Sequence, residues 1–540
     1  MRPPFIFCLT ILPALLFPGA CRNLHSTGPS SSPSIHSCKS PIEEARHFSF
    51  APARSYRPRP ATLTNVTSHR GERYAATTET GFKKTTEAPR STFSVDVDTA
   101  SYTNVRRIIT SKSKPPAEAV RIEEMINYFD YNYPKKTNEA PFTLADEVTT
   151  CPWKPKHKLV RIALNSESQM ETKRAPANLV FLIDVSGSMN SPDKLPLLKS
   201  GFLAMVENLN SDDRVAIVTY AGSAGLALPS TSCKNKAAIT TALDNLSAGG
   251  STAGGQGINL AYQIAKKHCI RNGINRVILA TDGDFNVGLN NDDELIELIT
   301  EKAKSGVFIT VLGLGSGNLN DSMLEKISGR GNGTYAYLDT LSEAKKVLVH
   351  DLTQSITTVA KDVKLQVEFN PAHVKAYRLL GYDNRRLEDS DFNDDKKDAV
   401  EIGNGHQVTA FYEVVPVGTP MDEGNLLPLR YREVETGTEQ AGQFTDELMT
   451  VHLRYKKPAS SKSKLLTYRI ANTSTPFTGS TEDFRFATSV AAFGLWLQRS
   501  EYAPRLNKTQ ILSWAKAGKG KDDFGYREEF IDLVGAAKRS

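Results

Sequence analysis

The sequence predicts an α/β protein with a doubly wound parallel sheet, flanked by a β-rich region and followed by C-terminal helices. Between about residues 176 and 356, apolar runs typical of buried strands alternate with segments of helical periodicity, which is the pattern of a parallel sheet with helices on both faces. After residue 357 the apolar residues alternate with period two, as in half-buried antiparallel strands. From about residue 479 the helical period returns.

The predicted α/β region opens on the fully apolar strand 179–183, and its first helix, 194–210, carries its apolar residues on one face. The later strands alternate with one or two helices. We expect strands at 214–220, 276–281, 307–312 and 333–338 and helices around 239–246, 258–265, 292–305 and 342–353. Ligands bind at the carboxyl ends of the strands in such sheets, so we expect a site in the loops after residues 183 and 281.

The β-rich region has clean period-two alternation, which indicates a β-sandwich-like domain. Its predicted strands are 363–369, 374–380, 408–414 and 449–455. A further strand-like segment, 159–164, lies before the α/β region. If it pairs with the later strands, the α/β region is an insertion in a β-rich frame; otherwise that frame only flanks it. Ser480 and Asp483 have the spacing of a capping box at the start of the C-terminal helices.

The first twenty residues have the features of a secretory signal peptide. Arg2 supplies a positive start, and the apolar stretch 5–17 is too short to span a bilayer. The segment 18–21 resembles the end of a bacterial lipoprotein signal, in which Cys21 would carry the lipid; the alternative is a plain secretory signal. Either way we expect export to the bacterial cell envelope, and the lipid would anchor the chain to a membrane on its periplasmic or outer side.

The residues between Cys21 and about residue 90 are rich in Ser, Pro, Thr and Arg and lack periodicity, so we expect a disordered tether. Beyond it, the segment 92–98 alternates like a strand, and 99–109 and 116–129 have helical patterns. Asp96 and Asp98 could hold a metal, but helix capping before Ala100 is the favoured interpretation.

The most informative residues form the motif Asp184-Val-Ser186-Gly-Ser188, directly after the apolar strand. One carboxylate and two hydroxyls are oxygen donors, so the expected ion is Mg²⁺ or Mn²⁺. Two hydroxyls cannot complete the coordination of such an ion, so other loops must contribute. Thr252 lies in a glycine-rich turn and Asp282 follows the strand that ends at residue 281, which makes both candidates.

Other interpretations of these residues are weaker. The motif by itself could be a simple Ser or Asx turn at the end of a strand. A nucleophile elbow requires glycine where Asp184 stands, and a P-loop requires Gly-Lys-Ser or Gly-Lys-Thr after Gly255, where Gln256 and Gly257 follow instead.

Together the five positions resemble the metal-ion-dependent adhesion site of the von Willebrand factor type A family. The resemblance implies that Ser186, Ser188 and Thr252 are direct metal ligands and that Asp184 and Asp282 act mostly through water. It also implies that a carboxylate of a protein partner completes the coordination. The segments 92–102 and 121–134 are similar to the N-terminal extension of a bacterial group of type A proteins that also carry an additional C-terminal domain.

Composition and spacing exclude several other classes. The net charge of +6 is small for 540 residues and is not gathered into a basic stripe, so we expect no nucleic-acid binding. The run Gly313–Gly317 lacks the third glycine of a dinucleotide loop, so we expect no nucleotide. Cys233 and Cys269 could pair in an oxidising compartment or be two buried free thiols.

Two function classes remain for the metal site. The first, which the sequence favours, is a non-enzymatic binding protein; the second is a metal-dependent hydrolase or an accessory to one. A hydrolase needs a general base near the metal, and Asp284 is the only candidate because no histidine lies in the three loops. A scaffold with a purely structural metal is a further alternative.

The predicted organisation of the chain is as follows: signal peptide 1–20, tether 21–90, N-terminal extension 91–175, type A domain 176–356, β-rich domain 357–478 and helical region 479–540.

Overall fold

The computed structural model describes residues 66–539, apart from positions 70, 77, 96–97, 136–139, 167–173, 222, 250–253, 272, 284–291, 352–357, 396–401, 422–445, 459 and 461. The predicted signal peptide and Cys21 therefore lie outside the described residues. The prediction of a tether up to residue 90 is wrong in its last part, because the strands β1 (Val66–His69), β2 (Glu72–Ala75) and β3 (Lys83–Lys84) lie there. These strands are too short and too polar to have a visible period.

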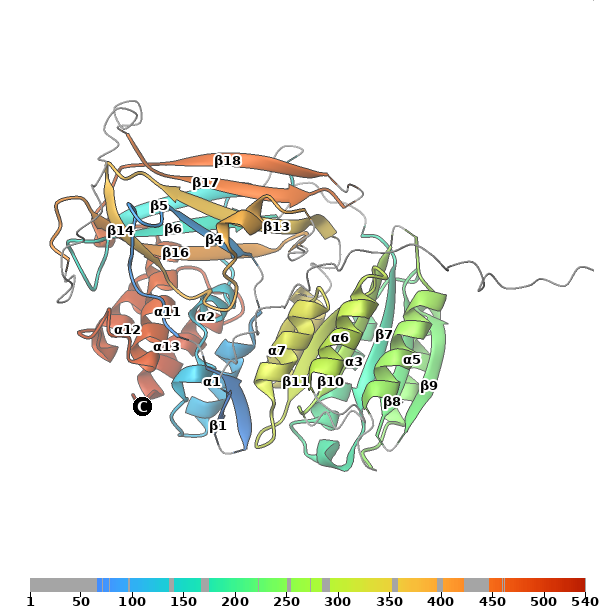
Figure 1. Cartoon of the computed structure of the whole chain (residues 1–540). Helices are drawn as coiled ribbons and strands as arrows, with labels where there is room; N and C mark the ends of the chain where they lie inside the picture. Colours follow the sequence, from blue (N-terminus) through green and yellow to red (C-terminus); the bar gives the residue numbers. More distant parts are fainter. Residues whose placement is uncertain are drawn as a thin grey trace, which may run out of the picture. The chain divides into compact units, whose positions relative to one another are not determined.

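A six-stranded sheet in the order β12-β11-β10-β7-β8-β9 forms the centre of the α/β unit (Figure 1). Its strands are β7 (Ala177–Asp184), β8 (Arg214–Tyr220), β9 (Ala224–Ser232), β10 (Ile274–Thr281), β11 (Phe308–Leu314) and β12 (Tyr335–Leu338). Neighbouring strands are parallel except for β9, which returns antiparallel along β8. The predicted doubly wound sheet is confirmed, with this antiparallel edge strand as an addition.

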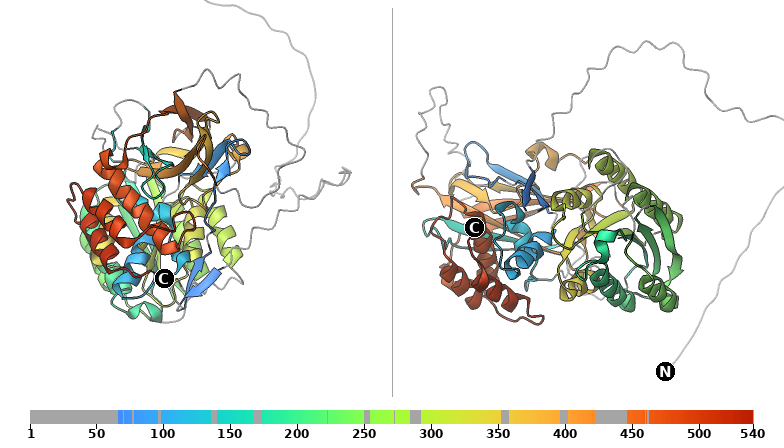
Figure 2. Two further views of the ribbon diagram at one scale, coloured as in Figure 1. Left: turned by 90° about the vertical axis from the view of Figure 1, so that its left-hand side faces the viewer. Right: turned by 90° about the horizontal axis from the view of Figure 1, so that it is seen from below.

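Helices cover both faces of this sheet, as the views in Figures 1 and 2 show. Phe202 packs with the helices of one face and stacks on Phe181 of β7, with ring centroids 4.1 Å apart. The helices of this face are α3 (Leu195–Asn208), α4 (Lys236–Asp244) and α8 (Leu341–Lys345). Those of the other face are α5 (Gly254–Lys267), α6 (Asp292–Ala303) and α7 (Asp321–Arg330).

Two further sheets form a β-sandwich with a shared core. The first contains β15 (Ile402–Gly403), β13 (Thr358–Phe369), β17 (Glu447–Lys456) and β18 (Ser463–Ala471), with β4 (Arg90–Ser94) paired to β13. The second contains β3, β14 (Val374–Leu379), β16 (Gln407–Pro416), β6 (Lys158–Asn165) and β5 (Thr143–Thr150). β6 precedes the α/β unit and pairs with β16, which follows it. The α/β unit is therefore an insertion in the β frame.

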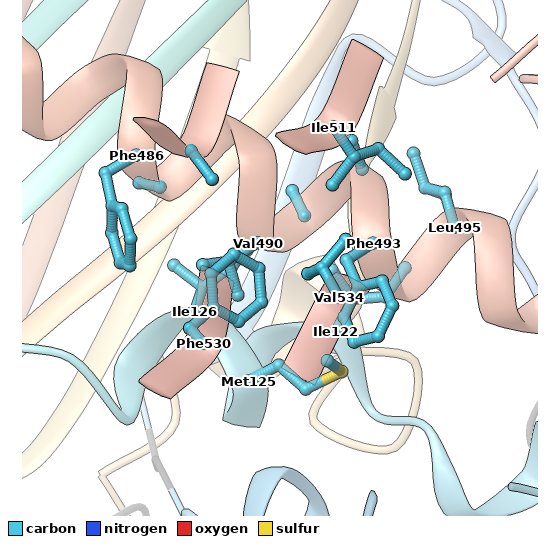
Figure 3. Close-up of a cluster of buried hydrophobic side chains, with 14 of the residues drawn as sticks. Ile122, Met125, Ile126, Phe486, Val490, Phe493, Leu495, Ile511, Phe530 and Val534 are labelled. Atoms are coloured by element: carbon cyan, nitrogen blue, oxygen red, sulfur yellow. The ribbon is translucent and has the colours of Figure 1, made fainter. Parts of the chain in front are cut away.

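A helical layer covers the outer face of the second sheet. Along β6, Val160, Ile162 and Leu164 point into the sandwich core, while Leu159 and Ala163 contact the helices, as the period of a strand requires. The helices of this layer are α1 (Ala100–Thr110), α2 (Ile122–Asn127), α11 (Glu482–Gln498), α12 (Lys508–Ala517) and α13 (Tyr526–Ala536). Figure 3 shows how α2 and the C-terminal helices share one apolar cluster, to which Met125, Val490 and Phe530 contribute.

Several local predictions need correction. The expected helix 116–129 is a 3₁₀ turn (Ala117–Ala119) followed by α2. Asp98 does not cap a helix: its carboxylate accepts a hydrogen bond from the Tyr335 main chain and pairs with Arg385 at 2.7 Å. The cap of α11 is Thr481, not Ser480, and its hydroxyl accepts from the main chain of Phe484.

Both cysteines of the α/β unit are free, Cys233 buried and Cys269 exposed. The alternative of two free thiols is therefore confirmed, but the expected burial is wrong for Cys269. Within the described part of the chain, no helix has the length and apolarity that crossing a membrane requires.

Candidate metal centre

The candidate site lies at the carboxyl edge of the two central strands of the six-stranded sheet. β7 and β10 are parallel neighbours with Ile183 opposite Ala280. Asp184 is the last residue of β7, and Asp282 is the first residue after β10. Both therefore lie at the same edge of the sheet, and both are fully buried. Every residue of β7 is buried, because helices cover both faces of a parallel strand in this position.

The D-x-S-x-S loop is held in place by hydrogen bonds to Asp184. Its carboxylate accepts from the main-chain N–H of Ser186 at 2.9 Å and from the hydroxyl of Thr281 at 3.3 Å. A short 3₁₀ turn, Gly187–Asn190, follows and turns Ser188 back toward the site. The hydroxyl oxygens of Ser186 and Ser188 lie 3.0 Å apart. The loop therefore presents two neighbouring oxygen donors above a buried carboxylate.

The second carboxylate, Asp282, has a cation as its partner. The ammonium of Lys194, a buried residue at the start of α3, donates to Asp282 at 2.8 Å and to the side chain of Asn318 at 3.3 Å. Burial raises the pKa of Asp282, but hydrogen bonds from Lys194, Ser188 and Asn318 outweigh it, so that the pKa is lowered. Asp282 is therefore ionised and already partly neutralised.

Asp184 is in a different electrostatic position. Burial and the nearby charge of Asp282 raise its pKa to about 6, although hydrogen bonds from Ser186 and Thr281 act in the opposite direction. A buried carboxylate with a raised pKa lacks compensating positive charge. A cation close to Asp184 and the two serine hydroxyls would supply it.

The donors present fit a hard cation. Hydroxyl and carboxylate oxygens are the ligands of Mg²⁺ and Mn²⁺. The described residues contain no cluster of three or more His, Cys, Asp or Glu side chains that could hold a metal, so this candidate site depends on its serine hydroxyls.

The structure brings four of the five sequence-predicted residues together: Asp184, Ser186, Ser188 and Asp282. Thr252 lies outside the described residues, as do Asp284 and Cys21. The chain that leads to Thr252 does reach the site, because the N–H of Gly249 donates to the carbonyl of Val185 at 2.7 Å.

Sequence reasoning missed Lys194, Thr281 and Asn318. Lys194 had one visible signal, since it is a charged residue at the start of an apolar helix directly after the motif. Nothing in the sequence indicated Asn318. Its loop is fixed by the N-terminal hairpin, where Glu72 of β2 accepts from the N–H of Gly317 at 3.0 Å and pairs with Arg107 of α1 at 2.9 Å.

Comparison with known proteins agrees with this architecture. The family model of the von Willebrand factor type A domain matches residues 178–354, and a model described as von Willebrand factor matches residues 68–161. A model described as the C-terminal part of the uncharacterized protein YfbK matches residues 354–539. YfbK of Escherichia coli (strain K12) is 40% identical over 481 residues, which cover 88% of this chain and 82% of that protein. The chain belongs to the YfbK family.

Other known proteins are similar to parts of this chain. The uncharacterized protein sll0103 of Synechocystis is 28% identical over 57% of this chain and 68% of its own length. The bovine inter-alpha-trypsin inhibitor heavy chain H3 is 26% identical over 29% of this chain and 18% of its own length. Among solved structures, a von Willebrand factor type A protein from Catenulispora acidiphila covers 75% of this chain and 99% of its own, with 16% identity and a TM-score of 0.42.

Proposed function

We propose that this member of the YfbK family is a non-enzymatic binding protein of the bacterial cell envelope. In this proposal it is exported, anchored to a membrane through a lipid on Cys21, and holds a carboxylate of a protein partner through Mg²⁺ or Mn²⁺. The observation that carries the proposal is the convergence of the Ser186 and Ser188 hydroxyls above the buried Asp184, beside Asp282. Type A domains commonly bind proteins in a metal-dependent way, which supports the same conclusion.

Each residue of the site has a role in this proposal. Ser186 and Ser188 would bind the metal directly, with Thr252 as the third hydroxyl ligand. Asp184 holds the loop through the Ser186 main chain and supplies negative charge, as does Asp282. The metal would offer a coordination position to a partner Asp or Glu, and burial of that contact by the partner would strengthen the attraction.

Titration calorimetry of the full chain with Mn²⁺ tests the metal site. We expect one site in the wild type and none in Asp184→Asn, because the variant loses the charge that a buried cation requires. Asp193→Asn is the matched control, since Asp193 is an exposed acid on the same loop whose carboxylate accepts from the hydroxyl of Ser191. Circular dichroism must confirm that the variants fold. Equal Mn²⁺ binding by wild type and Asp184→Asn would refute the site.

A second experiment tests recognition of the carboxylate. Water-proton relaxation reports how many exchangeable waters remain on protein-bound Mn²⁺. A short peptide that contains Asp should displace water from the bound ion, and the same peptide with Asn should not, because a neutral amide is a weaker ligand for a hard dication. Displacement by both peptides, or by neither, would count against carboxylate recognition.

A further inference from the structure

Lys194 places an ammonium group inside the site. Its side chain is buried, with 9% of its surface exposed, and its partner Asp282 is fully buried. The ammonium donates to Asp282 at 2.8 Å and to Asn318 at 3.3 Å. An amine in such a position is not a mobile surface group that could leave when another cation arrives.

Neighbouring residues hold both the main chain and the side chain of Lys194 in place. Its main chain begins helix α3, with the Lys194 N–H bonded to the carbonyl of Ser191 and the Leu198 N–H bonded to the carbonyl of Lys194. Its aliphatic stem lies against Gly315, where an added Cβ would be 2.1 Å from the lysine Cε. Gly315 has φ of +69°, a conformation that favours glycine. A residue with a side chain at 315 would therefore have to displace the lysine.

The charges of the site follow from these contacts. Among the described residues of the site, Asp184 and Asp282 contribute two negative charges and Lys194 one positive charge, which leaves a net charge of −1 without metal. A divalent ion would change this to +1. Asp184, Asp282 and Ser186 are buried whereas Ser188 is exposed, so the ion would lie beside buried groups where excess charge is costly. An added carboxylate would bring the net charge back to zero. Without Lys194, the two aspartates alone would neutralise the metal.

We infer that Lys194 couples the two ligands of the site, so that the metal alone binds weakly and an anionic ligand binds together with it. This inference rests on the proposed function, because it assumes that the divalent ion binds beside Asp184. Lys194 is a positioning residue that acts through Asp282 and does not touch the ligand. The partner that fits this arrangement is an acidic one, and a neutral partner would leave the positive charge uncompensated.

Mn²⁺ titration of the full chain tests the coupling, first without and then with acetate as the carboxylate probe. In the wild type, acetate should tighten Mn²⁺ binding. Lys194→Met should bind Mn²⁺ without acetate about tenfold or more tightly than the wild type, because repulsion from the ammonium is gone, and acetate should then have little effect. Lys194→Arg retains the charge and should resemble the wild type.

Lys199→Met is the matched control, because Lys199 lies on the same helix and donates to main-chain carbonyls of Asp244 and Leu246. It should leave Mn²⁺ binding and its acetate dependence unchanged. If Lys194→Met does not fold, Lys194→Gln serves for the same comparison, since its amide can still donate to Asp282 without charge. Equal or weaker Mn²⁺ binding in the neutral variant would overturn the inference. Absence of Mn²⁺ binding in every protein, the wild type included, would instead refute the proposed metal site.

Discussion

At the scale of single residues, the two buried aspartates of the site differ because their neighbours differ. Asp282 has an ammonium within hydrogen-bond distance, whereas the groups that hydrogen-bond to Asp184 include a main-chain N–H and a threonine hydroxyl, both uncharged. Burial raises the pKa of both groups, and strong donors reverse this only for Asp282. A bound cation would therefore stabilise the charge of Asp184 most, on the side of the site where the serine hydroxyls lie.

A third buried carboxyl, Glu123 of α2, lies outside the site and makes stability depend on pH. Burial and the neighbouring charge of Glu124 raise its pKa from 4.5 to about 7. Because the folded-state pKa lies above the unfolded one, the stabilising contribution is fully present below about pH 4.5 and is lost as pH rises through about 7. The shift corresponds to about 3 kcal/mol between these limits.

We expect Glu123→Gln to remove this dependence. The amide resembles the neutral carboxyl, so the variant should match the wild type at about pH 4 and be more stable by up to about 3 kcal/mol at about pH 8. Urea unfolding at both pH values measures the difference. The control is Glu87→Gln at an exposed position, and its stability should equal that of the wild type at both pH values. A stability difference between Glu123→Gln and wild type that does not change with pH would contradict the prediction.

The candidate site was predictable from sequence to the extent that topology determines it. Asp184 and Asp282 each follow an apolar strand, and the carboxyl ends of neighbouring parallel strands necessarily meet. Lys194 and Asn318 were not predictable, because the direction of a long side chain and the fold of a loop depend on tertiary contacts. Here those contacts come from Gly315 and from the Glu72 hairpin, distant in sequence from the motif.

At the scale of elements, the strongly periodic segments were predicted well and the weakly patterned ones were not. The fully buried β7 is a continuous apolar run, as a strand covered on both faces must be. β9 was missed because most of its residues are partly or fully exposed and it contains Pro229, which suits only an edge strand. The short strands β1 to β3 have too few residues to establish a period.

One glycine sets how closely β12 approaches β11. A Cβ at Gly333 would lie 1.4 Å from the carbonyl oxygen of Ile309 in β11. The neighbouring Thr334 carbonyl accepts from the Val311 N–H at 2.9 Å, so the two backbones cannot separate without loss of the pairing. We expect Gly333→Ala to lower the free energy of unfolding by about 3 kcal/mol, as for other overpacked sites.

Urea unfolding of Gly333→Ala, compared with Gly535→Ala, measures this effect. Gly535 lies in helix α13, and a Cβ there would meet nothing within 4 Å. Alanine at this position should therefore be neutral or stabilise by about 0.5–1 kcal/mol. Similar stability losses in both variants would show that the close approach at Gly333 is not the cause.

At the scale of the whole molecule, buried ion pairs join the inserted α/β unit to the frame around it. Arg121, at the start of α2, donates to Asp321 of α7 at 2.6 Å and also pairs with Glu124. Asp98, before α1, pairs with Arg385 in the frame and bonds to the main chain of β12. The insertion itself was predictable from the strand 159–164, but these contacts were not, because charged residues far apart in sequence carry no pairing signal.

We expect Arg121→Met to cost about 3–5 kcal/mol of stability, because it leaves Asp321 and Glu124 buried without their counter-charge. Lys304→Met is the control, since Lys304 and its partner Glu301 are both 70% exposed; that change should stay within about 0.5 kcal/mol. Thermal and urea unfolding of the two variants provide the comparison. A loss in Arg121→Met no larger than in Lys304→Met would mean that this ion pair does not hold the two parts together.

The proposed anchor concerns how the whole folded protein is placed in the cell. If Cys21 carries the lipid, the protein should sediment with membranes, and Cys21→Ser should release it into the soluble exported fraction, because stable anchoring depends on the acyl chains. Cys38→Ser is the matched control, a cysteine in the same N-terminal region that should leave the distribution unchanged. Incorporation of labelled palmitate should disappear only in Cys21→Ser. Since the metal site lies far along the chain from Cys21, the released protein should retain the Mn²⁺ affinity of the wild type. Labelling that survives in Cys21→Ser would exclude this residue as the anchor and leave the metal-site proposal intact.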